Sequence, residues 1–117
     1  MIPERALELG RLVGQSDEYQ ALKRANDRLM AEQELRDALD KLRSLQLGVA
    51  EQAERGEGPK PEQQQELDQL VGRVQAHPAY QGVVAAQANF DKLMYRINEQ
   101  ILEGMKKGAD SRIISLG

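Results

Sequence analysis

The apolar residues of this chain recur mainly at the three- and four-residue steps of an amphipathic α-helix, and strand-like alternation is scarce. Near the N-terminus, one such stripe consists of Ile2, Ala6, Leu9 and Val13. Pro3 suits the first position of a helix, and Gly14 favours its end. The pattern therefore predicts a first helix over residues 3–14.

A second, long helix is predicted over residues 17–55. Ser16 can cap its N-terminus, and Asp17 and Glu18 place negative charge in the first turn, where the helix dipole favours it. At 1.5 Å per residue the helix would be about 60 Å long, which exceeds the usual dimensions of a domain of this size. Its apolar positions are Tyr19, Leu22, Ala25, Leu29, Leu35, Leu39, Leu42, Leu45 and Val49.

Two further helices follow a Gly- and Pro-rich loop at residues 56–61. The first covers residues 62–76 and stops before His77, since the residue before Pro78 is pushed out of the α region. The second covers residues 78–107. The remaining residues, 108–117, form a C-terminal tail whose apolar end either docks on the body or frays.

The last helix has the most regular pattern in the chain. Its stripe alternates steps of three and four, with Gln87 as a polar interruption, as expected for a helix packed along its length against others. Val84, Leu93 and Met105 widen the stripe, so burial on two sides is expected. The stripe itself consists of Tyr80, Val83, Gln87, Phe90, Met94, Ile97 and Ile101.

The predicted fold is an all-α bundle of two long antiparallel helices plus two short ones, in a single domain over residues 1–107. Both long helices carry apolar stripes longer than a small monomer can cover. We therefore expect homo-oligomerisation, as a dimer or tetramer, to complete the bundle. The residues predicted to form the core and oligomer interface are Tyr80, Val83, Phe90, Met94, Ile97, Ile101, Leu22, Leu29, Leu35 and Leu42.

Composition narrows the possible chemistry. The 117 residues contain no cysteine and one histidine, which removes disulfides, cysteine nucleophiles, cysteine-held clusters and multi-histidine metal sites. The net charge of −3 argues against direct nucleic-acid binding. No apolar run approaches the length of a membrane span, so no membrane insertion is expected. We predict no metal, no cofactor and a cytoplasmic protein.

Candidate reactive side chains have simpler structural interpretations. The acidic residues between positions 32 and 40 alternate with Arg and Lys and read as a solvated helix face. His77 lies at a helix break, where a polar ring commonly satisfies the turn, and no nucleophile motif accompanies it. The basic cluster around Arg24 is interrupted by Asp27 and has no aromatic platform nearby, as RNA binding would favour. The sequence therefore predicts no catalytic residues.

The succession of segments is more specific than any single motif. "ELGRLVGQSDEYQALKRANDRL" leads into a long charged helix and a Gly/Pro loop, and "VQAHPAYQGVVAAQANFDKLMYRINEQI" follows. This order resembles the YlbF/YmcA family of small helical bacterial proteins, over residues 3–105. The matching positions are Leu9, Ser16, Tyr19, Lys23, Ala25, Leu29, Pro78, Gln87, Phe90, Leu93, Ile97, Asn98 and Ile101.

The resemblance implies an all-helical, oligomeric protein without enzymatic activity. Some relatives act as adaptors that influence competence, sporulation and biofilm formation through the endoribonuclease RNase Y and messenger RNA processing. Relatives that hold iron–sulfur clusters do so with cysteines, which this chain lacks, so cluster binding is not carried over. The prediction is a bacterial regulatory adaptor that binds another protein.

Two other functions fit the same helical pattern. A nucleic-acid-binding protein would show an affinity that falls steeply as salt rises, and the acidic pI of about 5.2 makes this the weaker alternative. A holdase-like protein would clasp unfolded clients between its helix tips. The polar loop at residues 56–61 speaks against that alternative.

Overall fold

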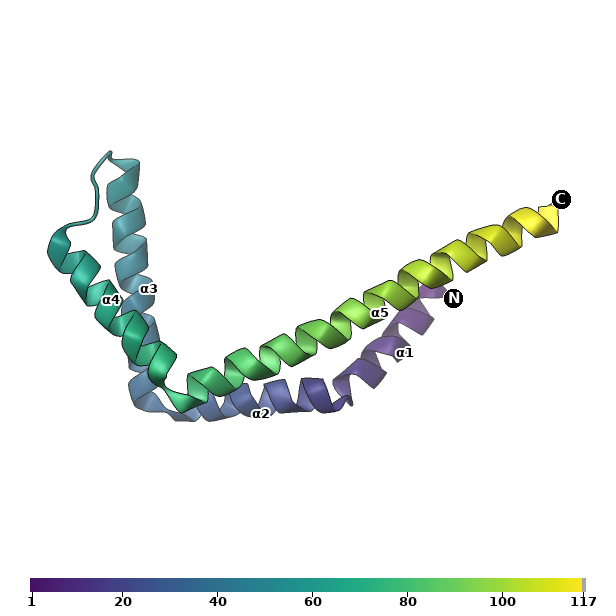
Figure 1. Ribbon diagram of the computed structural model, residues 1–117, viewed down its shortest axis with the longest axis horizontal. Helices are drawn as coiled ribbons and strands as arrows, with labels where there is room; N and C mark the ends of the chain where they lie inside the picture. The colour runs from purple at the N-terminus through teal and green to yellow at the C-terminus, as the bar shows by residue number, and fades with distance from the viewer. Residues whose placement is uncertain (117) are drawn as a thin grey trace.

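The structure is a computed structural model that describes the backbone of residues 1–116 and the side chains of residues 1–111. Over the described residues the chain is all-α, as predicted, with five helices (Figure 1). They are α1 (Ile2–Gly14), α2 (Asp17–Ala31), α3 (Gln33–Glu54), α4 (Pro61–Ala76) and α5 (Pro78–Leu116). The predicted tail from residue 108 continues α5 as helix, and the side chains of its apolar end lie outside the described residues.

The helices form two antiparallel arms that meet at an elbow (Figure 1). One arm pairs α2 with α5, and the other pairs α3 with α4. The molecule measures 70 × 37 × 20 Å and has a radius of gyration of 21.8 Å. A compact domain of this length has a radius of gyration of about 13 Å. The chain is therefore extended, and much of its helical surface faces outward.

The predicted single helix over residues 17–55 is wrong, because the structure divides it at Glu32. The backbone of Glu32 is extended, with φ −91° and ψ 99°. The break has a tertiary cause, since Pro78 forces a break between α4 and α5. One straight helix cannot remain packed on both α4 and α5, because these two helices diverge. The segment that packs against them therefore bends at Glu32, between α2 and α3. The two long helices of the prediction consequently pair over only part of their length.

The elbow contains the best-buried cluster of the described chain. Leu35 of α3, Val74 of α4 and Ala79 of α5 are only 2%, 3% and 1% exposed. Burial of this kind contributes about 25 cal/mol for each Å² of apolar surface removed from water. The half-buried side chains packed around the cluster are Leu29, Ala38, Leu39 and Tyr80.

The N-termini of α2 and α5 are capped by side chains, as the sequence predicts, whereas Glu32 before α3 forms no side-chain cap. The Oγ of Ser16 accepts a hydrogen bond from the backbone N–H of Tyr19 at 3.1 Å. The Nδ1 of His77 accepts one from the N–H of Ala79, also at 3.1 Å. These bonds satisfy donors that the first turn of a helix otherwise leaves unpaired.

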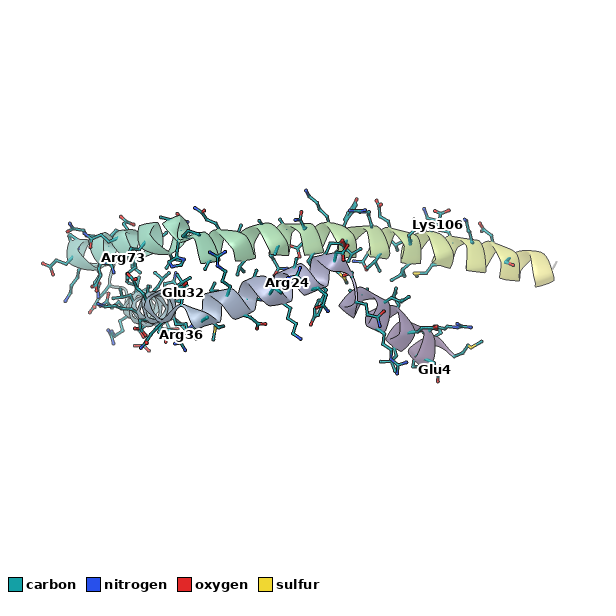
Figure 2. All side chains as sticks on the ribbon, turned by 90° about the horizontal axis from the view of Figure 1, so that it is seen from below. Glu4, Arg24, Glu32, Arg36, Arg73 and Lys106 are labelled. Atoms are coloured by element: carbon teal, nitrogen blue, oxygen red, sulfur yellow. The ribbon has the colours of Figure 1, made fainter. Side chains whose placement is uncertain are left out.

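The first helix stands apart from the body. It approaches the start of α2 but, among the described helices, no other element comes close to it. Figure 2 shows α1 diverging from α5, with Glu4 on its outer end. None of its residues is buried. α5 continues beyond the N-terminus of α1 (Figure 1).

Candidate interaction surface

Four of the predicted core and interface residues lie inside the α2–α5 arm or beside the elbow. Leu22 of α2 is 9% exposed, and Val83 of α5 is half-buried. Leu29 and Tyr80 pack against the elbow cluster. Their apolar surface is thus covered largely within one chain, and a role for them in contacts between chains stays a prediction.

The α3–α4 arm holds the other two leucines of the predicted set. Leu35 belongs to the elbow cluster, whereas Leu42 is half-buried farther along α3. Across the same arm, the Nζ of Lys41 lies 3.7 Å from the Oε1 of Glu66. The side chains of Lys41 and Glu66 are 66% and 44% exposed, so this solvent-screened ion pair contributes about 1 kcal/mol or less.

The remaining predicted residues line an apolar groove between α1 and α5. Phe90 lies at its inner end, where its ring contacts Tyr19 of α2 with the two centroids 5.7 Å apart. The groove has a volume of about 420 Å³. Its apolar lining residues are Ala6, Leu9, Val13, Tyr19, Phe90, Met94, Ile97 and Ile101.

The groove continues along α5 toward its C-terminal half. A neighbouring hollow of about 390 Å³ shares Leu9, Ile97 and Ile101 with it and adds the polar side chains of Arg96 and Gln100. Beyond it, Leu102 and Met105 are 58% and 64% exposed. Met105 follows Ile97 and Ile101 at steps of four and so extends the apolar stripe of α5 beyond the groove.

A second apolar hollow lies on the other side of the molecule, where α4 meets α5. It measures about 480 Å³, and Val84, which lines it, is 51% exposed. The other residues around it are Gln75, Tyr80, Gln81, Ala85 and Ala88. The sequence predicts burial of α5 on two sides, but within this chain Val84 and Met105 are exposed.

Gln87 does not interrupt the packed seam as the sequence predicted. Its side chain is exposed, and its Nε2 donates a hydrogen bond to Asp91 at 2.9 Å. Ala86, at 8% exposure, takes the seam position instead. At this level of α5 the buried position is therefore held by a small apolar side chain and not by a polar one.

The charged candidates lie where the solvated-face interpretation places them. The four acidic residues between positions 32 and 40 are exposed, and so is the basic cluster around Arg24. Figure 2 shows Arg24 on α2. Within residues 1–111, no three His, Asp or Glu side chains are close enough together to hold a metal ion. A polar cleft of about 360 Å³ between α3 and α4 is lined by Glu34, Asp37, Ala38, Lys41, Glu66, Gln69, Leu70 and Arg73.

One carboxyl group has a shifted pKa. The N-terminal ammonium of Met1 pairs with Glu4 and lowers the pKa of this carboxyl below its ordinary value, and the backbone N–H of Glu4 acts in the same direction. The group is fully exposed, so this is a helix-terminus effect and supports no catalytic role.

Sequence reasoning missed the small residues that position the arms. Ala79 and Ala86 are buried at helix contacts, but alanine is too common in helices for its position to announce burial. Sequence reasoning also missed a repeated arrangement within the chain. A Tyr–Gln pair follows each of the two capping residues, Tyr19–Gln20 after Ser16 and Tyr80–Gln81 after His77. Gln20 and Gln81 both donate to a carbonyl six residues earlier, at 2.8 and 3.1 Å. The repeated Tyr–Gln pair was the available signal.

The fold and its surfaces define an all-α protein with open apolar grooves between its helices. The chain belongs to the YlbF/YmcA family, because the family model described as "Control of competence regulator ComK, YlbF/YmcA" matches residues 2–106. This finding confirms the resemblance that the order of segments indicated.

A curated relative covers most of the chain as well. A UPF0342 protein of Staphylococcus saprophyticus is 26% identical over 100 residues, which are 86% of this chain and 88% of that protein. No helix in the described part of the chain is both long and apolar enough to cross a membrane.

Proposed function

We propose that this chain is a non-enzymatic regulatory protein that acts by binding other proteins in the cytoplasm, as a homo-oligomer. The observation that carries the proposal is the open apolar surface of the chain, on α1 and α5 and again where α4 meets α5, which protein partners would cover. The family's name supports a regulatory role, since it refers to control of the competence regulator ComK.

The regulated process is the processing of messenger RNA by RNase Y. This step rests on the family resemblance, and the absence of cysteine means that the chain would act without an iron–sulfur cluster of its own. The shape of the molecule suits an adaptor. An L-shaped chain with two separate apolar hollows can contact a second copy and a different protein at once.

The test compares messenger RNA 5′ ends in a strain that lacks the gene with those in its parent. We expect a subset of RNase Y-dependent ends to be lost, and to be restored by the wild-type gene. Depletion of RNase Y in the parent identifies the relevant ends and serves as the reference. Unchanged RNase Y-dependent ends in the deletion strain would reject this proposal.

A direct binding measurement separates the adaptor from an RNA-binding protein. The purified chain should bind purified soluble RNase Y, and it should show no affinity for a single-stranded RNA at low salt. Binding to RNA that weakens steeply between 50 and 200 mM salt would favour the nucleic-acid alternative instead.

A further inference from the structure

The first helix lacks the contacts that hold the other helices in place. α1 has 13 residues, and none of them is buried. An isolated helix of this length is only marginally stable in water. Its apolar stripe nevertheless faces the groove, where Leu9 and Val13 stand opposite Met94 and Ile97 without closing the space between them. The groove therefore has the apolar lining of a hydrophobic core but lacks the side chains that would fill it.

The amount of exposed surface indicates how large the missing part is. The chain exposes 9266 Å². A compact monomer of the same mass exposes about 6,400 Å². The difference of about 2,900 Å² is several times the roughly 800 Å² that each partner contributes to a standard interface. A partner large enough to form an extensive interface would cover it.

A second copy of the chain supplies surface that fits the groove. The C-terminal half of α5 projects beyond α1 as a helix with apolar side chains exposed at Ile101, Leu102 and Met105. An open groove and an unpaired apolar helix on one molecule are the two halves of a self-complementary contact.

We propose that α1 and the C-terminal half of α5 form the dimer interface, in which the same two segments of a second copy complete a four-helix bundle. This inference deepens the homo-oligomer of the proposed function by assigning its surface. Met94, Ile97 and Ile101 then contact the second copy, whereas Tyr80 and Val83 remain inside their own arm. Four helices packed around one core are a stable arrangement that two diverging helices cannot provide.

The test uses two leucines on the same helix. Leu9 lines the groove and is 36% exposed, whereas Leu7 is 60% exposed and does not line it. By light scattering over a dilution series, we expect the wild-type chain and Leu7→Glu to be dimers. We expect Leu9→Glu to raise the dissociation constant at least about a hundredfold, because a symmetric interface contains the buried charge twice.

The outcomes distinguish this interface from the proposed function. Circular dichroism should show that Leu9→Glu keeps the helices of both arms, since no residue of α1 is buried in the packing of the chain. A Leu9→Glu protein that remains as dimeric as Leu7→Glu would overturn the assigned surface and leave an oligomer with another interface. A wild-type chain that is monomeric on dilution would overturn the homo-oligomer as well.

A distance measurement provides a second readout that does not depend on a disruptive variant. The chain has no cysteine, so one introduced cysteine carries one spin label per copy. Labels at Arg11→Cys on α1 should lie closer together in the dimer than labels at Gly58→Cys in the loop of the other arm. The reverse order would place the interface on the α3–α4 arm and reject the proposal.

Discussion

The ring of Tyr19 packs against the ring of Phe90 at an angle of 59°, and this contact joins the first turn of α2 to the middle of α5. It lies where the α2–α5 arm ends and the groove begins, so one side of Phe90 belongs to the intrachain packing and the other lines the groove. Tilted aromatic pairs contribute about 0.5–1.5 kcal/mol beyond the surface they bury.

A double-mutant cycle on this pair should give a coupling free energy of about 1 kcal/mol. The single variants are Tyr19→Leu and Phe90→Leu, which keep an apolar side chain at each position. Urea unfolding of the four proteins measures the free energies. A coupling close to zero would mean that the rings contribute only their buried area.

A charge at Phe90 should be far more damaging than the loss of its ring. Phe90→Asp places a carboxylate in the half-buried contact with Tyr19, and we expect a loss of about 3 kcal/mol or more in the free energy of unfolding. Tyr95→Asp is the matched control, because Tyr95 lies on the same helix and is 65% exposed. Similar melting temperatures for the two variants would contradict the assigned packing.

The elbow cluster should be the most sensitive apolar site in the described chain. Leu35→Ala removes a side chain that is 2% exposed and should cost about 2–5 kcal/mol. Leu47→Ala, on the same helix at 59% exposure, should cost less than about 1 kcal/mol. Thermal unfolding by circular dichroism compares the two. Equal losses would show that the elbow is not a packed core.

The caps at the two helix breaks should each stabilise the chain by about 1 kcal/mol. Ser16→Ala removes the acceptor for Tyr19 N–H and should lower the urea midpoint, while Ser16→Asn should retain most of the stability. Ser44→Ala is the control, because Ser44 lies exposed inside α3. His77→Ala should likewise lower the urea midpoint, because it removes the acceptor for Ala79 N–H, and His77→Asn should retain most of the stability. Loss of the regulatory effect in a stable His77→Asn protein would indicate a further role for the ring.

The pairing at the N-terminus predicts a weak dependence of α1 on pH. The pKa of Glu4 is lowered in the folded chain, so its stabilising effect is present above the ordinary carboxyl range and is lost as the pH falls through the lowered pKa. A carbon-detected NMR titration should report this lowered pKa. Acetylation of the N-terminus removes the ammonium and should move the pKa back toward its ordinary value.

The sequence predicts the helical elements well where local signals mark their ends. Ser16, the glycines and prolines of the 56–61 loop and Pro78 each change the backbone chemistry, and α1, α2, α4 and α5 begin within about a residue of the predicted positions. Glu32 carries no such signal. Its extended backbone follows from the break at His77, between α4 and α5. This is a long-range effect that the periodicity of apolar residues does not predict.

The predicted site could be located only in part for a related reason. Periodicity identifies which faces of α5 are apolar, but it does not say which chain covers each face. Tyr80 and Phe90 share one stripe, yet Tyr80 packs into the elbow and Phe90 borders the open groove. The direction in which α1 diverges decides this difference. No residue of α1 encodes it in a way that a single sequence makes visible.

The paired breaks at Glu32 and His77 make the elbow rigid. The chain changes direction between α2 and α3 and, beside this break, between α4 and α5. The side chains of Leu35, Val74 and Ala79 fill the corner between the two breaks. Rotation about one break would strain the other, so the corner resists bending that a single-stranded joint would allow. A protein bound to one arm would therefore keep a fixed orientation relative to a protein bound to the other arm.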